Sequence, residues 1–158
     1  MVGTSVYGFD YSIIIHKLRL SNCTTLTIMN TLPKFNKTLF GVKIVSGRDS
    51  ILELHYPEDI EIDLRQAEII DEFILEATEG KDIYMFVNFI NCYGHMTPDA
   101  QTFFAKKAPT IPQIKALAIV LNNLPMRILV KFHIRVFKPS YLTKVFSSPT
   151  LAKAWLKS

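Results

Sequence analysis

The sequence has little cysteine: two residues, Cys23 and Cys92, in a chain of 158. Two thiols so far apart form no disulfide framework and match no metal-ligand spacing. The histidines are also scattered, because they fall on separate predicted elements and none has a ligand set around it. They are His16, His55, His95 and His133. The sequence therefore predicts no metal site and no cofactor, and it fits a reducing, cytoplasmic location.

Long apolar runs and glycine-rich loops are missing as well. No run approaches the roughly 18–20 apolar residues that a membrane span needs. The first twenty residues show no basic segment followed by a continuous apolar one, so we expect no secretory signal. Gly94 is the only glycine between Asn88 and Lys107, where a strand is predicted to lead into a helix. A phosphate-binding loop is therefore not expected there.

Acidic residues are absent from one part of the chain. Residues 100–158 hold ten Lys/Arg and no Asp/Glu, whereas residues 49–99 hold thirteen Asp/Glu and two Lys/Arg. Such asymmetry has two interpretations: an anionic partner for the basic part, or acidic and basic elements that neutralise each other within one fold. The net charge of +4 and the pI near 9.1 are borderline, so the nucleic-acid signal is not strong.

Strands and helices alternate in the predicted elements. Residues 38–57 form two β-rich runs around the turn-forming "SGRDS", which predicts a hairpin. Residues 61–80 show apolar positions at helical spacing, with Asp63 and Gln66 as a capping box and Gly80 at the end. Residues 82–90 are continuously apolar and β-prone, as expected of a strand covered on both faces.

The second half repeats this alternation. The pattern predicts strands at residues 114–123 and 142–148, a helix at residues 124–138 that stops before Pro139, and a last helix capped by Ser148. The order predicts an α/β fold: a hairpin followed by alternating units, with a mixed sheet whose centre is parallel and helices packed on it. We assign residues 38–158 to this domain. Residues 1–37 are an extension, either extra strands or loosely attached.

The segment "GHMTP" is the first candidate site. Thr97, Pro98 and Asp99 have the features of a helix start: an N-cap, a proline at the first helical position and an acid in the first turn. His95 and Met96 precede them at the carboxyl end of a central strand, where α/β folds bind ligands. Cys92 lies near His95, but no third orienting group or oxyanion hole accompanies them, so no enzyme is predicted.

A basic helix face is the second candidate site. Arg127, Lys131 and Arg135 recur every four residues, and Lys138 follows just beyond. An apolar side faces away from them and consists of Ile128, Leu129, Phe132 and Val136. A basic amphipathic helix can approach anionic lipid or an acidic protein surface. The alternative is a core-packing helix whose basic stripe is merely solvated.

Several segments together resemble a known family. They are "EIDLRQAEIIDEFI", "VNFINC" with "MTPDAQTFFA", "IKALAIVL" and the ending "FKPSYLTKVFSSPTLAKAWLK". From about Thr38 to Ser158 the chain resembles the STAS-like, SpoIIAA-like domains, in particular a bacterial subgroup of unknown function. Relatives of the anti-anti-sigma branch carry a phosphorylated serine after an aspartate at this helix start. The matching positions here are Thr97 and Pro98, so the resemblance leaves Thr97 as either a phosphate acceptor or a plain cap.

The resemblance implies a non-enzymatic, regulatory domain that binds a protein partner, with a homodimer left open. The alternative is binding of a small apolar or anionic ligand such as a lipid, since related CRAL-TRIO folds have been grouped with STAS domains. The basic stripe and six phenylalanines support this alternative, although such aromatic residues more often pack in a core: Phe86, Phe89, Phe103, Phe104, Phe132 and Phe137. A closed core beneath "GHMTP" would favour the protein partner, and an open apolar cavity would favour the ligand.

Overall fold

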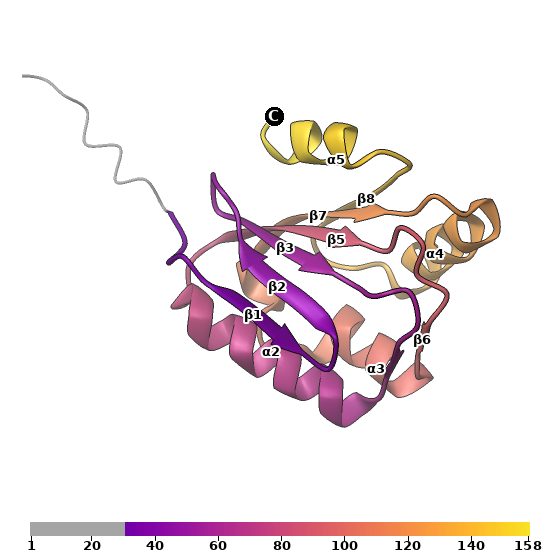
Figure 1. Cartoon of the computed structure of the whole chain (residues 1–158), viewed down its shortest axis with the longest axis horizontal. Coiled ribbons are helices and arrows are strands. Elements are labelled where there is room, and N and C mark those ends of the chain that lie inside the picture. Colours follow the sequence, from indigo (N-terminus) through magenta and orange to yellow (C-terminus); the bar gives the residue numbers. More distant parts are fainter. Residues whose placement is uncertain (1–30) are drawn as a thin grey trace, which may run out of the picture.

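A six-stranded mixed sheet forms the centre of residues 31–158, the part of the chain described by the computed structural model (Figure 1). Its strands are β1 (Asn36–Leu39), β2 (Val42–Ser46), β3 (Ile51–His55), β5 (Ile83–Asn88), β7 (Ile114–Val120) and β8 (Leu142–Phe146). They lie in the order β1-β2-β3-β5-β7-β8. The first three are antiparallel, and β3, β5, β7 and β8 run parallel. The predicted α/β class with a parallel centre is confirmed.

The predicted hairpin is present as β2 and β3, but the first β-rich run is not one strand. It is divided by a two-residue turn at Phe40 and Gly41, whose φ angles are 50° and 85°. Leu39 pairs with Val42 across this turn, so β1 and β2 form a second hairpin. Positive φ at both central residues is the geometry that a tight hairpin needs. A phenylalanine in such a turn gives no sequence signal, which explains why the prediction merged the two strands.

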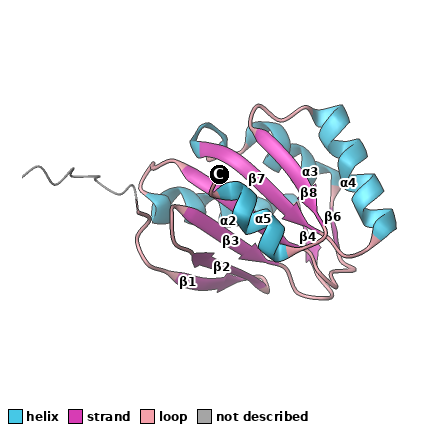
Figure 2. Cartoon of the chain, turned by 90° about the horizontal axis from the view of Figure 1, so that it is seen from above, coloured by secondary structure: helices cyan, strands magenta, loops and turns pink. Residues whose placement is uncertain are grey.

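Helices cover both faces of the sheet. They are α2 (Leu64–Thr78), α3 (Pro98–Thr102) with the π-helical turn η1 (Phe103–Lys107), the short 3-10 turn η2 (Ile111–Gln113), α4 (Leu124–Phe137) and α5 (Pro149–Leu156). Figures 1 and 2 show α2 and α3 on one face, α5 on the other and α4 beside the last strand. A separate pair of short parallel strands, β4 (Glu61–Ile62) and β6 (His95–Met96), lies at the start of α2 and α3.

The start of α2 was predicted correctly in detail. The Asp63 carboxylate accepts a hydrogen bond from the Gln66 backbone N–H at 2.8 Å, and the Gln66 side chain accepts one from the Asp63 N–H at 3.1 Å. The helix ends at Glu79 and Gly80, which both have positive φ. Ser148 also precedes its helix as predicted, but its side chain makes no capping hydrogen bond.

Two core layers lie on opposite faces of the sheet because neighbouring side chains along a strand alternate. Leu52 and Leu54 of β3 pack toward α2, where Ile70 and Ile74 are buried. The other layer lies under α5 and contains Ile51, Phe86, Ala116, Ala118, Val120, Ala152 and Leu156. Lys153 of α5 also donates to the Glu53 carboxylate of β3 at 2.6 Å. These contacts hold α5 over the middle of the sheet.

The domain division remains a prediction. Residues 1–30 of the predicted extension lie outside the described residues. Strand β1 begins at Asn36, so the predicted boundary between residues 37 and 38 falls inside a strand of the sheet.

Candidate functional site

The loop that contains "GHMTP" is held by backbone pairing with the chain before α2. Three backbone N–H groups of the loop donate hydrogen bonds to carbonyl groups of residues 58–62. The pairs are Tyr93 with Glu58, His95 with Ile60 and Thr97 with Ile62. Their distances are 2.7, 2.9 and 2.9 Å. Gly94 lies against the Ile60 backbone, so close that no Cβ atom could be placed there. The loop is thus a fixed element of the fold that ends in β6.

Thr97 is the N-cap of α3, as predicted. Its hydroxyl oxygen accepts a long hydrogen bond, 3.4 Å, from the Ala100 N–H. Pro98 follows in the first helical turn, and Asp99 places a carboxylate there. Every residue of this start has a structural role, and phosphorylation of Thr97 remains a prediction.

The other two loop candidates differ in exposure. The His95 side chain is exposed, with Nε2 3.5 Å from the Glu61 carboxylate. Met96 is half-buried. Cys92 is buried, and burial raises the pKa of its thiol although the Gly94 backbone N–H opposes this; nearby Asp59 raises it further. A raised thiol pKa disfavours the thiolate that a nucleophile needs. Among residues 31–158 no three His, Cys, Asp or Glu side chains are grouped so that they could hold a metal.

Helix α4 is not the core-packing helix that the sequence allowed as an alternative, because none of its residues is buried. Arg127 is half-buried, whereas Lys131, Arg135 and Lys138 are exposed as predicted. The apolar side is exposed too: Ile128 is 62%, Leu129 47%, Phe132 59% and Val136 55% accessible. The sequence therefore located an amphipathic helix correctly, but it could not show that residues 31–158 leave this apolar side exposed.

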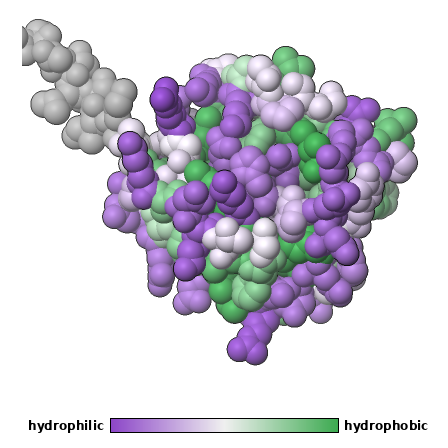
Figure 3. Space-filling model, viewed as in Figure 1, coloured by the Kyte–Doolittle hydropathy of each residue, from purple (hydrophilic) through white to green (hydrophobic). Residues whose placement is uncertain are grey.

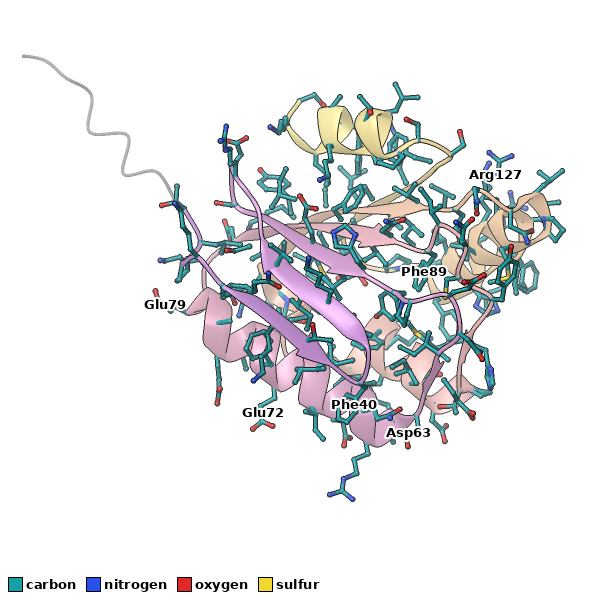
Figure 4. All side chains as sticks on the ribbon, viewed as in Figure 1. Phe40, Asp63, Glu72, Glu79, Phe89 and Arg127 are labelled. Carbon is teal, nitrogen blue, oxygen red and sulfur yellow. The ribbon has the colours of Figure 1, made fainter. Side chains whose placement is uncertain are left out.

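A cavity of about 480 Å³ explains why α4 is not packed into the core. One wall is the sheet, with Leu54, Met85, Val87, Leu117 and Ile119. A second wall is formed by Phe104 and Ala105 of η1 and by Ala108, which follows it. The third wall is α4, with Met126, Leu129, Val130, His133, Ile134 and Phe137. Residues 92–96 of the loop close one side. Figure 4 labels Phe89, which follows β5 and lines the cavity, and Arg127 near the start of α4.

Most polar groups of the cavity wall are already paired within the protein. The Asp71 carboxylate accepts hydrogen bonds from the hydroxyl and the N–H of Thr110. The Gln101 amide donates to the Met96 carbonyl at 2.8 Å, and the Tyr141 hydroxyl donates to the Phe104 carbonyl at 3.4 Å. The wall therefore offers mainly apolar contact to anything inside.

Asp71 gives the protein a specific pH dependence. Burial raises the pKa of its carboxyl above 3.8, although two hydrogen bonds from Thr110 oppose the shift. The folded protein then holds this proton more tightly than the unfolded chain, so folding stability falls as pH rises from 3.8 through the raised pKa. For each pH unit by which the pKa is raised, the free energy of unfolding is about 1.4 kcal/mol lower above this pH range than below it. We expect urea unfolding at several pH values to show this loss in the wild type and not in Asp71→Asn.

Thr110→Val is the companion variant. It removes the hydroxyl that stabilises the charged carboxylate, so the loss of stability should extend to higher pH than in the wild type. Identical profiles for wild type, Asp71→Asn and Thr110→Val would show that Asp71 does not titrate differently in the folded protein.

Residues 45–158 match a family described as a domain of unknown function, DUF7793. The chain belongs to the DUF7793 family. The match runs from β2 to the C-terminus and so contains the loop, the cavity walls and α4. No functionally curated protein matches this DUF7793 chain.

The fold has a counterpart among solved structures. An uncharacterised DUF3478-family protein from Shewanella loihica PV-4, with a SpoIIAA-like fold, superposes with a TM-score of 0.51 and 12% identity. The match covers 80% of this chain and 94% of that one. The resemblance to SpoIIAA-like domains is therefore confirmed at the level of the fold. Within residues 31–158, no helix is long and apolar enough to cross a membrane.

The sequence did not identify the cavity. Its wall residues come from segments far apart in the chain, and most are ordinary apolar residues at strand or helix spacing. The one available signal was that α4 has apolar residues on two sides, of which one lines the cavity and the other is exposed.

Proposed function

We propose that this domain binds a small, largely apolar ligand in the cavity between the sheet, η1 and α4. The observation that carries the proposal is the cavity itself. Its volume of about 480 Å³ lies within the roughly 300–1,000 Å³ of typical ligand sites. The space is partly open to solvent, as a ligand-binding cleft is, and is not an enclosed void of the core.

The lining defines the chemistry of the ligand. Aliphatic and aromatic side chains dominate it, and the carboxylate of Asp71 is satisfied by Thr110. A sugar or nucleotide would lose many hydrogen bonds to water and gain few from this wall, where His133 is one of the few polar side chains, and that loss is costly. A hydrocarbon-rich molecule such as a fatty-acyl or isoprenoid chain gains from the same surface.

The proposed role is binding without catalysis. Cys92, the nearest nucleophile, is buried with a raised thiol pKa, and the exposed His95 has Glu61 as its ionic neighbour. A protein partner is the second candidate function, and the exposure of Tyr93 (69%) and His95 favours it. Because the same loop lines the cavity, a partner at this surface would lie next to the bound ligand.

Native mass spectrometry tests the proposal. The full-length protein, purified without detergent, should carry an additional mass that disappears on denaturation and partitions into organic solvent. Protein stripped of this mass should bind the fluorescent fatty acid cis-parinaric acid with saturable enhancement at one site. A protein with no bound mass and no saturable probe binding would overturn the proposal.

A further inference from the structure

Residues 31–158 leave an apolar stripe uncovered on the outer surface of α4. Leu124, Ile128, Phe132 and Val136 recur every four residues, the spacing of one helix face. Their accessible fractions are 58%, 62%, 59% and 55%. Figure 3 shows apolar surface at the edge of the molecule where Figure 1 draws α4. Exposed apolar side chains that lie together on one helix face are typical of a contact surface.

A basic stripe runs along the same helix beside the apolar one, and not on the opposite side as expected from the sequence. Arg127, Lys131 and Arg135 each precede a member of the apolar stripe by one position, and Lys138 follows the helix. No ion pair within residues 31–158 involves any of these four cations. The chain has no acidic residue at all from 100 onward. A partner that matches this surface of α4 would therefore have both an apolar region and negative charge.

A second copy of the protein and residues 1–30 of the same chain both match the surface of α4 poorly. A second copy docked symmetrically through α4 would bring Arg127, Lys131 and Arg135 against their own counterparts, and like charges at such an interface are unfavourable. Residues 1–30 contain one acid, Asp10, against two Lys/Arg, so they cannot neutralise the stripe.

We propose that α4 docks on the surface of an anionic lipid bilayer. The apolar stripe would lie at the boundary of headgroups and acyl chains, and the four cations would lie at the level of the lipid phosphates. The opposite face of the helix, with Met126, Val130 and His133, continues to line the cavity. Leu129 belongs to both surfaces, since it lines the cavity and is 47% exposed. Docking does not depend on a ligand in the cavity.

Co-sedimentation with vesicles tests this docking. We expect the full-length protein to bind phosphatidylcholine vesicles that contain 30% phosphatidylglycerol, at least about tenfold more strongly than pure phosphatidylcholine vesicles, with loss of binding as salt is raised. Ile128→Ser/Phe132→Ser and Lys131→Glu/Arg135→Glu should each lower the partition coefficient more than about tenfold.

Matched variants far from α4 serve as controls. Leu151→Ser removes an equally exposed apolar side chain (61%) from α5, and Lys37→Glu/Lys43→Glu makes the same charge change on β1 and β2. Both should bind like the wild type. Circular dichroism should show every variant folded, as expected for substitutions of exposed side chains.

Three results would overturn the proposal. They are no binding to anionic vesicles at low salt, an equal loss in the control variants, or charge-dependent binding that the serine variant leaves unchanged. A concentration-dependent dimer that Phe132→Ser dissociates, without vesicle binding, would assign the stripe to a second copy instead.

Discussion

Replacing Gly94 with alanine is expected to destabilise the protein by about 3 kcal/mol, the upper part of the usual range for overpacking. An alanine Cβ would lie 2.0 Å from the carbonyl oxygen of Ile60 and 2.6 Å from its nitrogen. Neither atom belongs to a flexible side chain, so the backbone itself must move. The His95 N–H donates to the same carbonyl at 2.9 Å, and this hydrogen bond would be strained or lost. Urea unfolding monitored by circular dichroism measures the cost.

Gly80→Ala is the matched control. Gly80 has a φ angle of +72°, but no atom lies within 4 Å of the position of its Cβ. Only the backbone conformation is penalised, which costs about 1 kcal/mol. Similar losses for the two variants would show that the approach of Gly94 to Ile60 is not a packing constraint. A Gly94→Ala protein should also lose affinity for cis-parinaric acid, because the loop forms part of the cavity wall.

Filling the cavity is expected to abolish ligand binding. Ala105 lies on η1, is half-buried and lines the cavity. In Ala105→Trp, the indole ring would occupy space that the ligand needs, and we expect the affinity for cis-parinaric acid to fall more than about tenfold, which corresponds to about 1.4 kcal/mol. Thermal stability should be maintained, since the added apolar surface fills an existing space rather than displacing packed side chains.

The control for this variant introduces the same side chain elsewhere. Ala154 is exposed on α5, across the sheet from the cavity, so Ala154→Trp should bind the probe like the wild type. Val130→Phe adds bulk from the α4 side and should weaken binding in the same direction. Full affinity in both folded cavity variants would place the ligand outside the cavity.

Features that depend on a few neighbouring residues were predicted well. The capping box of Asp63 and Gln66, the Thr97 cap and the stop of α4 before Pro139 each follow from contacts within one helical turn. Such contacts use local backbone groups, so the residue types at fixed spacing are sufficient to identify them. The alternation of these elements was in turn sufficient for the fold class.

Features that depend on distant segments were predicted incompletely. The Phe40–Gly41 turn was missed because Phe40 adopts a positive φ, which is uncommon for a phenylalanine. The sequence left two interpretations of Ile128, Phe132 and Val136: they form a contact surface, or they pack into the core. Helical spacing identifies a face but does not reveal what lies opposite it.

By itself the sequence determined the α/β order, the helix ends, the charge asymmetry and the resemblance to SpoIIAA-like domains. All of these are encoded in composition or in short-range patterns. Only the tertiary structure decided that an apolar cavity separates α4 from the sheet and that the apolar stripe of α4 faces outward. Both depend on the distance between elements that are far apart in the chain. That distance is set by the summed packing of many side chains, and no local pattern records it.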